Sequence, residues 1–347
     1  MNHRQAIAAV VALLLAVTAY AQKTAITVTT TVPEGSLLFT AMTQPFVSAV
    51  HSRCGDAVDL KPFGTGVLAP FNEGHKAVQD GRATAAHTTP IWAVNLDPTN
   101  AILGSLPGGL SPEAMLVWLY KEGGRDLWVK YRREQMGLHP IVVGMGTTEI
   151  FAHSHKPIRN GADLKGMKFR TAGAWAEIIK TFGATPVVLA GADVYPMLER
   201  RAIDAAEFLN PSGNSTSGLA NIAKFVIVPG IHSASWPYEV VFKADFFDKL
   251  PKPVQACLTD AGELATLQAY TTFGALDLKA MATMREKNEI ISLNPAFVQE
   301  VKALGRKWML EKAEEQAGKG NKWVKEITGS YFRFQDSWER NSDYRAR

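Results

Sequence analysis

The sequence predicts an α/β protein of two doubly wound lobes joined by hinge strands, followed by a long C-terminal helical segment. Two observations predict this fold. Strand-like runs alternate with helical patterns on both sides of residue 140, as in sheets whose strands are linked by crossover helices. From Lys252 onward, apolar residues recur at helical spacing almost to the end of the chain. We expect the hinges near residues 145–150 and 228–241.

The clearest alternating unit extends from Leu164 to Asn210. Asp193 is a plausible N-cap for its second helix, and Glu207 lies on its last strand. Its predicted elements are a strand at 167–170, a helix ending at Gly183, a strand at 186–189, a helix, and a strand at 205–208.

Arg170 ends the first strand of this unit, directly before a helix. Ligands of open α/β sheets bind at the carboxyl ends of strands, near helix N-termini with free N–H groups. The planar guanidinium of arginine matches a carboxylate in bidentate fashion. These residues predict a receptor for a small carboxylate. The alternative is a surface arginine paired with an aspartate.

The N-terminal half follows the same alternation. Trp92 follows a strand end, where it could cover the apolar side of a ligand or pack in the core, and Ser111 is a favoured N-cap before Pro112. The expected strands are 25–31, 57–63, 83–89 and 138–144, and the helices include 72–80 and 127–134.

The first 21 residues are typical of a secretory signal peptide. Arg4 precedes an apolar run from Ala6 to Val17, and an Ala-x-Ala site precedes Gln22. The run is shorter than the roughly 20 residues of a membrane span, although a retained N-terminal anchor is the alternative. We therefore expect a soluble, exported mature chain.

Composition excludes several classes of protein. The formal charge of +4 carries no basic run, so no nucleic-acid partner is predicted. No catalytic motif or zinc-binding spacing occurs, which argues against an enzyme. Cys54 and Cys257 form either one bridge or two buried thiols, because the sequence does not set their separation.

The lobe boundaries follow from the two hinges. We predict lobe I at 22–145 plus 233–275, and lobe II at 146–232 plus part of 276–310. A C-terminal helical segment covers 311–347.

Three stretches together resemble the substrate-binding proteins of TRAP transporters, of the DctP type. The resemblance covers nearly the whole mature chain and is strongest to the branch that binds 2-oxo and 2-hydroxy monocarboxylates. The stretches are GDAVDLKPFGTG, LPGGLSPEAMLVWLYKEGGRDLW and LKGMKFRTAGAWAEIIKTFGATPVVLAGADVYPMLERRAIDAAEF.

The resemblance implies a periplasmic binding protein-like fold of type II that closes on an organic acid. The arginine of its K-G-x-K-x-R motif, here Arg170, holds the substrate carboxylate. A cation bridges protein and substrate in this branch. Its ligands here would be Glu207, the backbone carbonyl of Phe208, and Glu149 in the hinge turn.

Two residues depart from that pattern. The relatives carry tryptophan where this chain has Phe208, and an amide where it has Glu149. Two carboxylates in one pocket repel each other unless a cation, a basic group or a proton intervenes. We therefore expect either a cation, Ca²⁺ or Na⁺, at Glu149 and Glu207, or no metal and a substrate with donor groups. The alternative is that Glu149 points to solvent.

Further substrate-binding candidates lie around the hinges. Asn210 could donate to a ligand oxygen, Thr148 lies in the hinge turn, and Trp236 occupies a pocket position of the relatives. Glu239 is a weaker candidate, and Phe208 also counts among the substrate-binding residues. The resemblance implies that the long C-terminal helix can support a homodimer.

We expect a periplasmic solute-binding protein that delivers a small organic acid to membrane transporter subunits. One alternative is an extracytoplasmic sensor that passes its bound state to a receptor. Another is a binding protein for a sugar acid, an aromatic acid or a dicarboxylate. Sensing and transport both need only capture and closure, so the residues do not separate the sensor from the transport protein.

Overall fold

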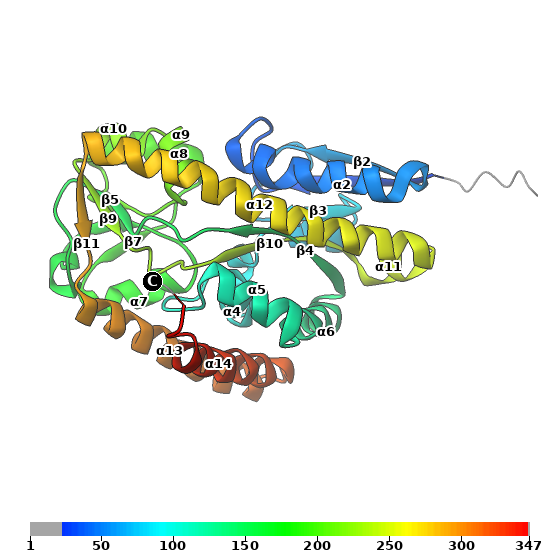
Figure 1. The fold of residues 1–347 in the computed structure, drawn as a ribbon. Coiled ribbons are helices and arrows are strands. Elements are labelled where there is room, and N and C mark those ends of the chain that lie inside the picture. The colour runs from blue at the N-terminus through cyan, green and yellow to red at the C-terminus, as the bar shows by residue number, and fades with distance from the viewer. Residues whose placement is uncertain (1–22, 346–347) are drawn as a thin grey trace, which may run out of the picture.

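The computed structural model describes residues 23–345, whose strands form two separate mixed sheets (Figure 1). The strands are Thr24–Thr30 (β1), Val58–Phe63 (β2), Ala85–Thr88 (β3), Leu138–Gly146 (β4), Ala152–Ser154 (β5), Lys168–Arg170 (β6), Thr185–Val187 (β7), Ala205–Ala206 (β8), Phe225–Val228 (β9), Trp236–Lys243 (β10) and Glu289–Ser292 (β11). The first sheet has the order β2-β1-β3-β10-β4, and the second has the order β11-β9-β5-β8-β6-β7.

The chain crosses from one sheet to the other at the predicted hinges. The chain leaves the first sheet between β4 and β5, through residues 147–151, and returns between β9 and β10, through residues 229–235. Each sheet contains one strand that is antiparallel to its neighbours, β10 in the first and β5 in the second. The expected two-lobed α/β architecture with hinge strands is therefore confirmed.

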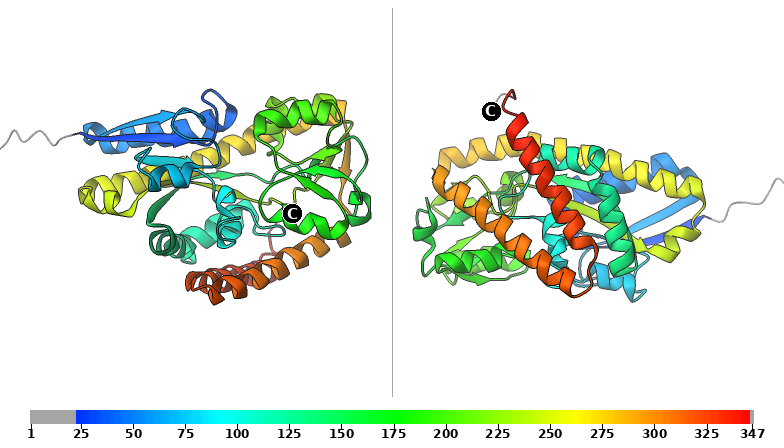
Figure 2. Two further views of the ribbon diagram at one scale, coloured as in Figure 1. Left: turned by 180° about the vertical axis from the view of Figure 1, so that it is seen from behind. Right: turned by 90° about the horizontal axis from the view of Figure 1, so that it is seen from below.

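Helices cover the faces of both sheets (Figures 1 and 2). They are Gln44–Cys54 (α2), Gly74–Gln79 (α3), Thr99–Gly104 (α4), Pro112–Lys121 (α5), Gly124–Met136 (α6), Gly173–Ile178 (α7), Gly191–Glu199 (α8), Pro211–Thr216 (α9), Leu219–Ile222 (α10), Ala244–Lys249 (α11), Lys252–Lys287 (α12), Pro295–Gly318 (α13) and Trp323–Asn341 (α14). Short helical turns occur at Phe39–Thr43 (η1) and Pro90–Ala93 (η3), among others.

One long helix, α12, extends along both sheets (Figure 1). It contacts β4 and α2 beside the first sheet, and α9, α10 and β11 beside the second. Beside the first sheet, its buried Phe273 joins Met42 and Phe242 in one apolar core. The proposed lobe boundary at residues 275 and 276 falls inside this continuous helix, and the division into lobes stays a proposal.

A disulfide joins α2 to α12. Cys54 ends α2 and is bonded to Cys257, 203 residues further along the chain. The two Cα atoms are 5.4 Å apart, within the range that a bridge requires. The two cysteines therefore form one bridge and are not two buried thiols, a choice that their spacing in the sequence did not decide.

The predicted long C-terminal helical segment is present as α13 and α14, which form a pair on the outside of the molecule (Figure 2). Its aromatic residues pack into the same chain. Tyr331 contacts Trp118 edge-on at a centroid distance of 5.2 Å, and its hydroxyl accepts a hydrogen bond from the Leu110 N–H at 2.7 Å. The side of α14 that carries Tyr331 is therefore part of the core of the same chain. The homodimer stays a proposal.

Two helix N-caps were predicted from the sequence, Ser111 and Asp193. Ser111 caps α5 as predicted, with its Oγ accepting from the Ala114 N–H at 3.3 Å. The prediction of Asp193 as an N-cap is wrong, because α8 begins at Gly191 after Ala190. Asp193 instead lies in the first turn, where the helix dipole favours a negative charge.

The predicted signal peptide, residues 1–21, lies outside the described residues. Within residues 23–345, none of the helices combines the length and the apolar character that a membrane crossing requires.

Candidate functional site

Arg170 and Glu207 lie together because two parallel strands end side by side. In the pairing of β6 with β8, Arg170 is opposite Ala206, so Glu207 follows at the carboxyl end of the neighbouring strand. A side chain from each strand end then reaches the same edge of the sheet. This placement agrees with the position expected for Arg170 from the sequence.

The Arg170 guanidinium is buried, with 4% of the residue exposed. Its Nη1 donates to the Glu207 backbone carbonyl at 2.8 Å and to Glu207 Oε2 at 3.1 Å, and its Nη2 donates to the Leu189 carbonyl at 3.1 Å. Its Nε has no partner among the described residues. Phe208 packs against the cation, with the guanidinium carbon 5.2 Å from the ring centroid.

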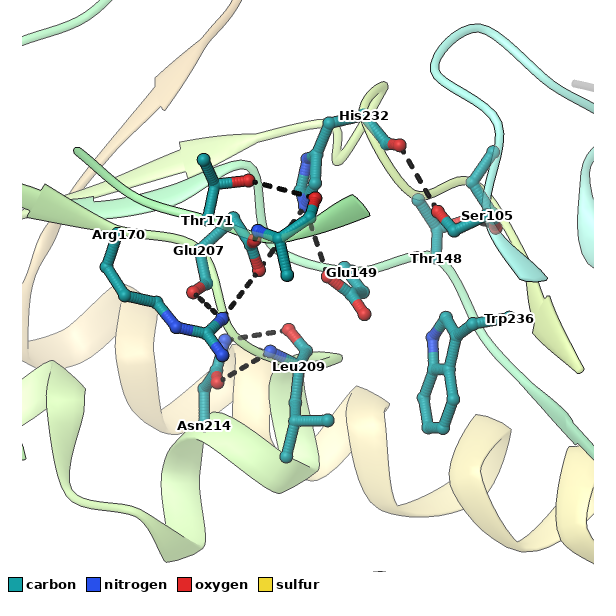
Figure 3. A network of polar contacts seen from close by, with 12 residues as sticks. Ser105, Thr148, Glu149, Arg170, Thr171, Glu207, Leu209, Asn214, His232 and Trp236 are labelled. Atoms are coloured by element: carbon teal, nitrogen blue, oxygen red, sulfur yellow. Dashed lines mark hydrogen bonds and ion pairs between the residues drawn. The ribbon is translucent and has the colours of Figure 1, made fainter. Parts of the chain in front are cut away.

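Glu149 and His232 come from the two hinge connections, which run side by side at this point (Figure 3). The Glu149 N–H donates to the Ser233 carbonyl at 3.2 Å. Gly230 permits this approach, because a Cβ there would lie 2.1 Å from the Glu149 carbonyl oxygen. His232 Nε2 lies 3.1 Å from Glu149 Oε2 and 3.9 Å from Glu207 Oε2.

Glu149, Glu207 and His232 thus form a cluster whose potential ligand atoms lie within 4.8 Å of one another. Glu207 is further held by the Ala172 N–H, which donates to its Oε1 at 3.0 Å. Burial raises the pKa of Glu149, and the negative charge of Glu207 acts in the same direction, against the hydrogen bond from His232. The cluster therefore places a second carboxylate, that of Glu207, beside a buried Glu149 whose negative charge is disfavoured.

The cluster fits a bound cation. Two oxygens on one calcium ion lie at most roughly 5 Å apart, because each Ca–O bond is about 2.3–2.6 Å long. The separations within the cluster satisfy this limit. Glu149 and Glu207 were both expected from the sequence as ligands, and Glu149 points into the cluster rather than to solvent. The role of the Phe208 carbonyl stays a prediction.

Trp236 lies beside Glu149, on the side away from Arg170 (Figure 3). Its Nε1 donates to the Thr147 carbonyl at 2.6 Å, and only 5% of the residue is exposed. Gly146 makes room for the indole, since a Cβ there would lie 1.9 Å from the ring. The nearby Thr148 hydroxyl donates to the Ala234 carbonyl at 3.0 Å.

Asn210 is buried beneath the site and bonded to α12. Its Nδ2 donates to Asp277 Oδ1 at 2.9 Å, and the Ser212 N–H donates to the same oxygen at 2.8 Å. The Thr147 hydroxyl also donates to Asp277. The amide donors that were expected to face a ligand are therefore engaged by the protein, and a ligand contact for Asn210 stays a prediction.

Trp92 and Glu239 have packing or hydrogen-bond partners outside this cluster, and a ligand contact for Trp92 stays a prediction. Trp92 packs edge-on against Phe71 at a centroid distance of 4.9 Å. Its neighbour Ile91 approaches α7 so closely that a Cβ on Gly173 would lie 2.9 Å from the isoleucine side chain. The turn η3, which follows β3 of the first sheet, thus contacts α7, the helix that follows Arg170.

Glu239 lies on β10 and is fully buried. Its carboxylate accepts from Trp128 Nε1 at 2.9 Å and from Arg132 Nη2 at 2.6 Å, and it lies 2.7 Å from His75 Nε2. Every carboxylate oxygen is occupied within this network. Its surroundings do not support the weaker expectation that Glu239 lines the ligand pocket.

Two residues of the site were not predicted from the sequence. His232 lies in the predicted hinge segment, where only its proximity to Trp236 in the chain could have indicated it. Asp277 lies inside a long helical pattern and shows no local signal. Both reach the site only through the packing of distant segments.

The two sheets, their crossing connections and the buried polar cluster between them define a two-lobed solute-binding protein. The family of bacterial extracellular solute-binding proteins, family 7 (DctP), matches residues 28–316. The chain therefore belongs to this family, as its resemblance to the TRAP-transporter binding proteins predicted.

Two curated proteins are similar in sequence. A monocarboxylate 2-oxoacid-binding periplasmic protein of Nostoc sp. is 28% identical over 262 residues, which cover 75% of this chain and 70% of that protein. A 2,3-diketo-L-gulonate-binding periplasmic protein of Escherichia coli is 37% identical over 149 residues, which cover 42% of this chain and 44% of that protein.

Solved TRAP solute-binding proteins share the fold. One from Bordetella bronchiseptica, with calcium and picolinate, has a TM-score of 0.85 at 18% identity over 92% of this chain and 95% of that chain. One from Colwellia psychrerythraea, with calcium and pyruvate, has a TM-score of 0.85 at 20% identity over 92% and 96%. One from Pseudoalteromonas atlantica, with sodium and pyruvate, has a TM-score of 0.84 at 20% identity over 93% and 97%.

Proposed function

We propose that this chain is a periplasmic receptor that binds a small 2-oxo or 2-hydroxy carboxylate between its two sheets and delivers it to a TRAP-type membrane transporter. The observation that carries the proposal is the buried Arg170 beside the cluster of Glu149, Glu207 and His232. A guanidinium at the carboxyl end of a strand is suited to one carboxylate.

The substrate carboxylate would bind at Arg170. The guanidinium is already held in place by the carbonyls of Glu207 and Leu189, and its Nε has no partner among the described residues. Such preorganisation lowers the entropy cost of binding. Phe208 covers one face of the guanidinium and shields it from water.

The second oxygen of a 2-oxo or 2-hydroxy acid would bind toward Glu149 and Glu207. A carbonyl oxygen and two carboxylates repel one another, so this contact needs a positive charge between them. A cation held by Glu149 and Glu207 would supply that charge when bound. The Nostoc relative and the calcium- and pyruvate-containing Colwellia structure support this ligand class.

The two hinge connections would let the sheets close over the ligand. Glu149 and His232 lie on these connections, whereas Arg170 and Glu207 lie on strand ends of the second sheet. In the structure, Ile91 of η3 already lies against Gly173 at the start of α7. Capture by hinge closure between two lobes is a common mechanism of binding proteins.

A thermal-shift panel tests this proposal. The protein is unfolded and refolded to remove carried-over ligand, then mixed with pyruvate, longer 2-oxo acids, lactate, dicarboxylates, sugar acids and aromatic acids. Each acid is measured with Ca²⁺, with Na⁺ alone and with a chelator, and pyruvamide serves as the control without a carboxylate. A ligand at 100 times its dissociation constant adds about 2.7 kcal/mol to the free energy of unfolding.

Stabilisation by a 2-oxo or 2-hydroxy acid, and not by pyruvamide, is the expected result. Stabilisation confined to another acid class would overturn the ligand assignment. The absence of any effect across the whole panel would overturn the receptor function proposed for this site. Delivery to a transporter is tested separately, by uptake in vesicles that contain the membrane subunits.

A further inference from the structure

His232 lies on a hinge connection, and its side chain is only 3% exposed. Its Nε2 lies 3.1 Å from Glu149 Oε2 and 3.9 Å from Glu207 Oε2. The imidazole therefore faces both carboxylates that would hold the cation. Its contribution to the site was not expected from the sequence, and it changes the chemistry of the donor set.

Aromatic packing fixes the orientation of this ring. Phe151 contacts it edge-on at a centroid distance of 5.6 Å, and Trp175 lies at 6.4 Å. Its Nδ1 is buried and has no hydrogen-bond partner among the described residues. Nε2 is thus the nitrogen that the fold presents to the cluster, and a flip of the ring would have to displace packed aromatic side chains.

The three side chains are arranged as ligands of one small ion. In a tetrahedral site with bonds of about 2.0 Å, neighbouring ligand atoms lie roughly 3.3 Å apart. The distances of 3.1 and 3.9 Å from His232 Nε2 to the two carboxylates bracket this value. Small side-chain movements would suffice to close the three atoms around an ion.

The charges in the cluster favour a divalent ion. Arg170 balances one of the carboxylates Glu149 and Glu207, and a substrate carboxylate would add one further negative charge. A divalent cation with a neutral imidazole would make the sum zero, whereas a monovalent cation would leave a buried negative charge. Burial of uncompensated charge is costly.

The ligand atoms of the cluster favour some divalent ions over others. Calcium binds almost only oxygen ligands, whereas imidazole nitrogen suits Zn²⁺ and the neighbouring first-row transition ions. Two carboxylates, one imidazole and a position open to substrate match three-ligand zinc sites with an open position.

We propose that His232 is the third protein ligand of the cation at Glu149 and Glu207, and that this set favours a divalent transition ion such as Zn²⁺ over Ca²⁺ and Na⁺. The proposal rests on the proposed carboxylate and cation site and specifies its ion. The competing view is that His232 only forms an ion pair with Glu149.

Metal affinity and metal coordination test this assignment together. Refolded, chelator-stripped protein is titrated with Zn²⁺, Co²⁺ and Ca²⁺ against competing chelators, for wild type and for His232→Gln. The matched control is His51→Gln, an exposed histidine on α2. X-ray absorption of the zinc-loaded wild type reports directly whether imidazole scattering is present. Pyruvate and the other acids are titrated into the same samples with each ion.

The expected result is imidazole scattering in the wild type and tighter binding of Zn²⁺ than of Ca²⁺. His232→Gln should weaken Zn²⁺ binding at least about tenfold, since loss of even an outer-shell partner of a metal ligand has this effect. Ca²⁺ affinity should change much less, and His51→Gln should behave as wild type.

Zinc bound without imidazole scattering, or a preference for Ca²⁺ that His232→Gln leaves unchanged, would overturn the assignment. If an acid still binds with Ca²⁺ in that case, the proposed function stands without it. If no acid binds with any ion while imidazole scattering is present, the proposed function fails and the His232 assignment holds. The scattering measurement needs no variant, so a folding defect in His232→Gln would not decide the outcome.

Discussion

Arg170 is held by backbone carbonyls on both sides before any ligand arrives. Its two Nη atoms donate to Glu207 and Leu189, which follow the strands on either side of β6. Charge and shape both contribute to its proposed role. Lysine would keep the charge but would lose the planar fork that spans these carbonyls.

Two replacements of Arg170 should therefore distinguish the contribution of its charge to carboxylate binding from the contribution of its planar shape. We expect Arg170→Ala to weaken carboxylate binding by about 3–5 kcal/mol, because a buried carboxylate would lose its partner. Arg170→Lys should restore part of this loss. Calorimetric titration of the acid found in the panel measures both effects, with Arg200→Lys, at the exposed residue directly after α8, as the control.

Wild-type affinity in Arg170→Ala would contradict the assignment of this residue. The same variant leaves Glu207 buried without its guanidinium. Its ligand-free stability should therefore fall as well, and the melting temperature without ligand has to be recorded so that a folding defect is not mistaken for lost binding.

The residue scale also shows where sequence reasoning succeeds. Arg170 and Glu207 could be predicted, because each ends a strand within one short repeating unit whose pattern is legible in the chain. His232 could not be predicted, since its ring meets Glu149 only after two connections, 83 residues apart at this contact, come side by side.

At the scale of elements, α12 is the one that joins the site to the rest of the molecule. Its buried Asp277 accepts hydrogen bonds from Thr147 in one hinge connection, and from Asn210 and Ser212 at the start of α9. Glu149 lies two residues after Thr147, and Glu207 lies three residues before Asn210. One carboxylate of α12 thus positions both segments that carry the proposed ligands.

Asp277→Ala should destabilise the protein and weaken ligand binding together. The buried Ser212 N–H would lose its acceptor, at a cost of about 1–3 kcal/mol, and Asn210 and Thr147 would each lose their bonds to the carboxylate. Denaturant unfolding and ligand titration measure the two effects. Asp260→Ala, at an exposed position of the same helix, is the matched control and should change neither. A variant with unaltered affinity would show that Asp277 does not position the site.

The disulfide between α2 and α12 closes a loop of about 200 residues. Loops of this length lose much conformational freedom in the unfolded chain when they are bridged. The Cys54→Ser, Cys257→Ser double variant should therefore lose about 2–5 kcal/mol of unfolding free energy. Urea unfolding with and without reductant checks this expectation, and a reductant effect that persists in the double variant would contradict it.

At the scale of the whole molecule, each sheet contains a buried histidine that forms no ion pair with any residue between 23 and 345. Burial lowers the pKa of His87 on β3 and of His153 on β5 to about 3. The ordinary histidine pKa is near 6.5, so the unfolded chain takes up a proton at pH values where the folded chain does not. Above pH 6.5 these two histidines therefore do not reduce the free energy of unfolding. As the pH decreases from 6.5 toward 3, the free energy of unfolding falls.

We expect the unfolding free energy to decrease below pH 6.5 by up to about 1.4 kcal/mol per pH unit for each of these histidines. Urea unfolding between pH 7.5 and pH 5 measures this slope. His87→Gln and His153→Gln should each flatten it, and comparison with wild type cancels the contributions of the other groups. A slope that remains the same in both variants would contradict the neutral burial of these residues.

The alternation of strands and helices, the hinge positions and the Arg170 unit were determined by the sequence alone. Each depends on residues close together in the chain: turn residues, caps such as Ser111, and apolar spacing within one element. The family resemblance carries the same kind of local motif. For this reason the fold class and the strand-end residues could be predicted before any contact was known.

The tertiary structure alone decided which distant groups meet. It bonded Cys54 to Cys257, placed His232 against Glu149, set Asp277 beneath the hinge, and buried Glu239 against Arg132 rather than in the site. These contacts join segments far apart in the chain, and they depend on how the faces of whole elements pack. Local patterns hold no information about that packing, because many arrangements of the same elements satisfy them equally.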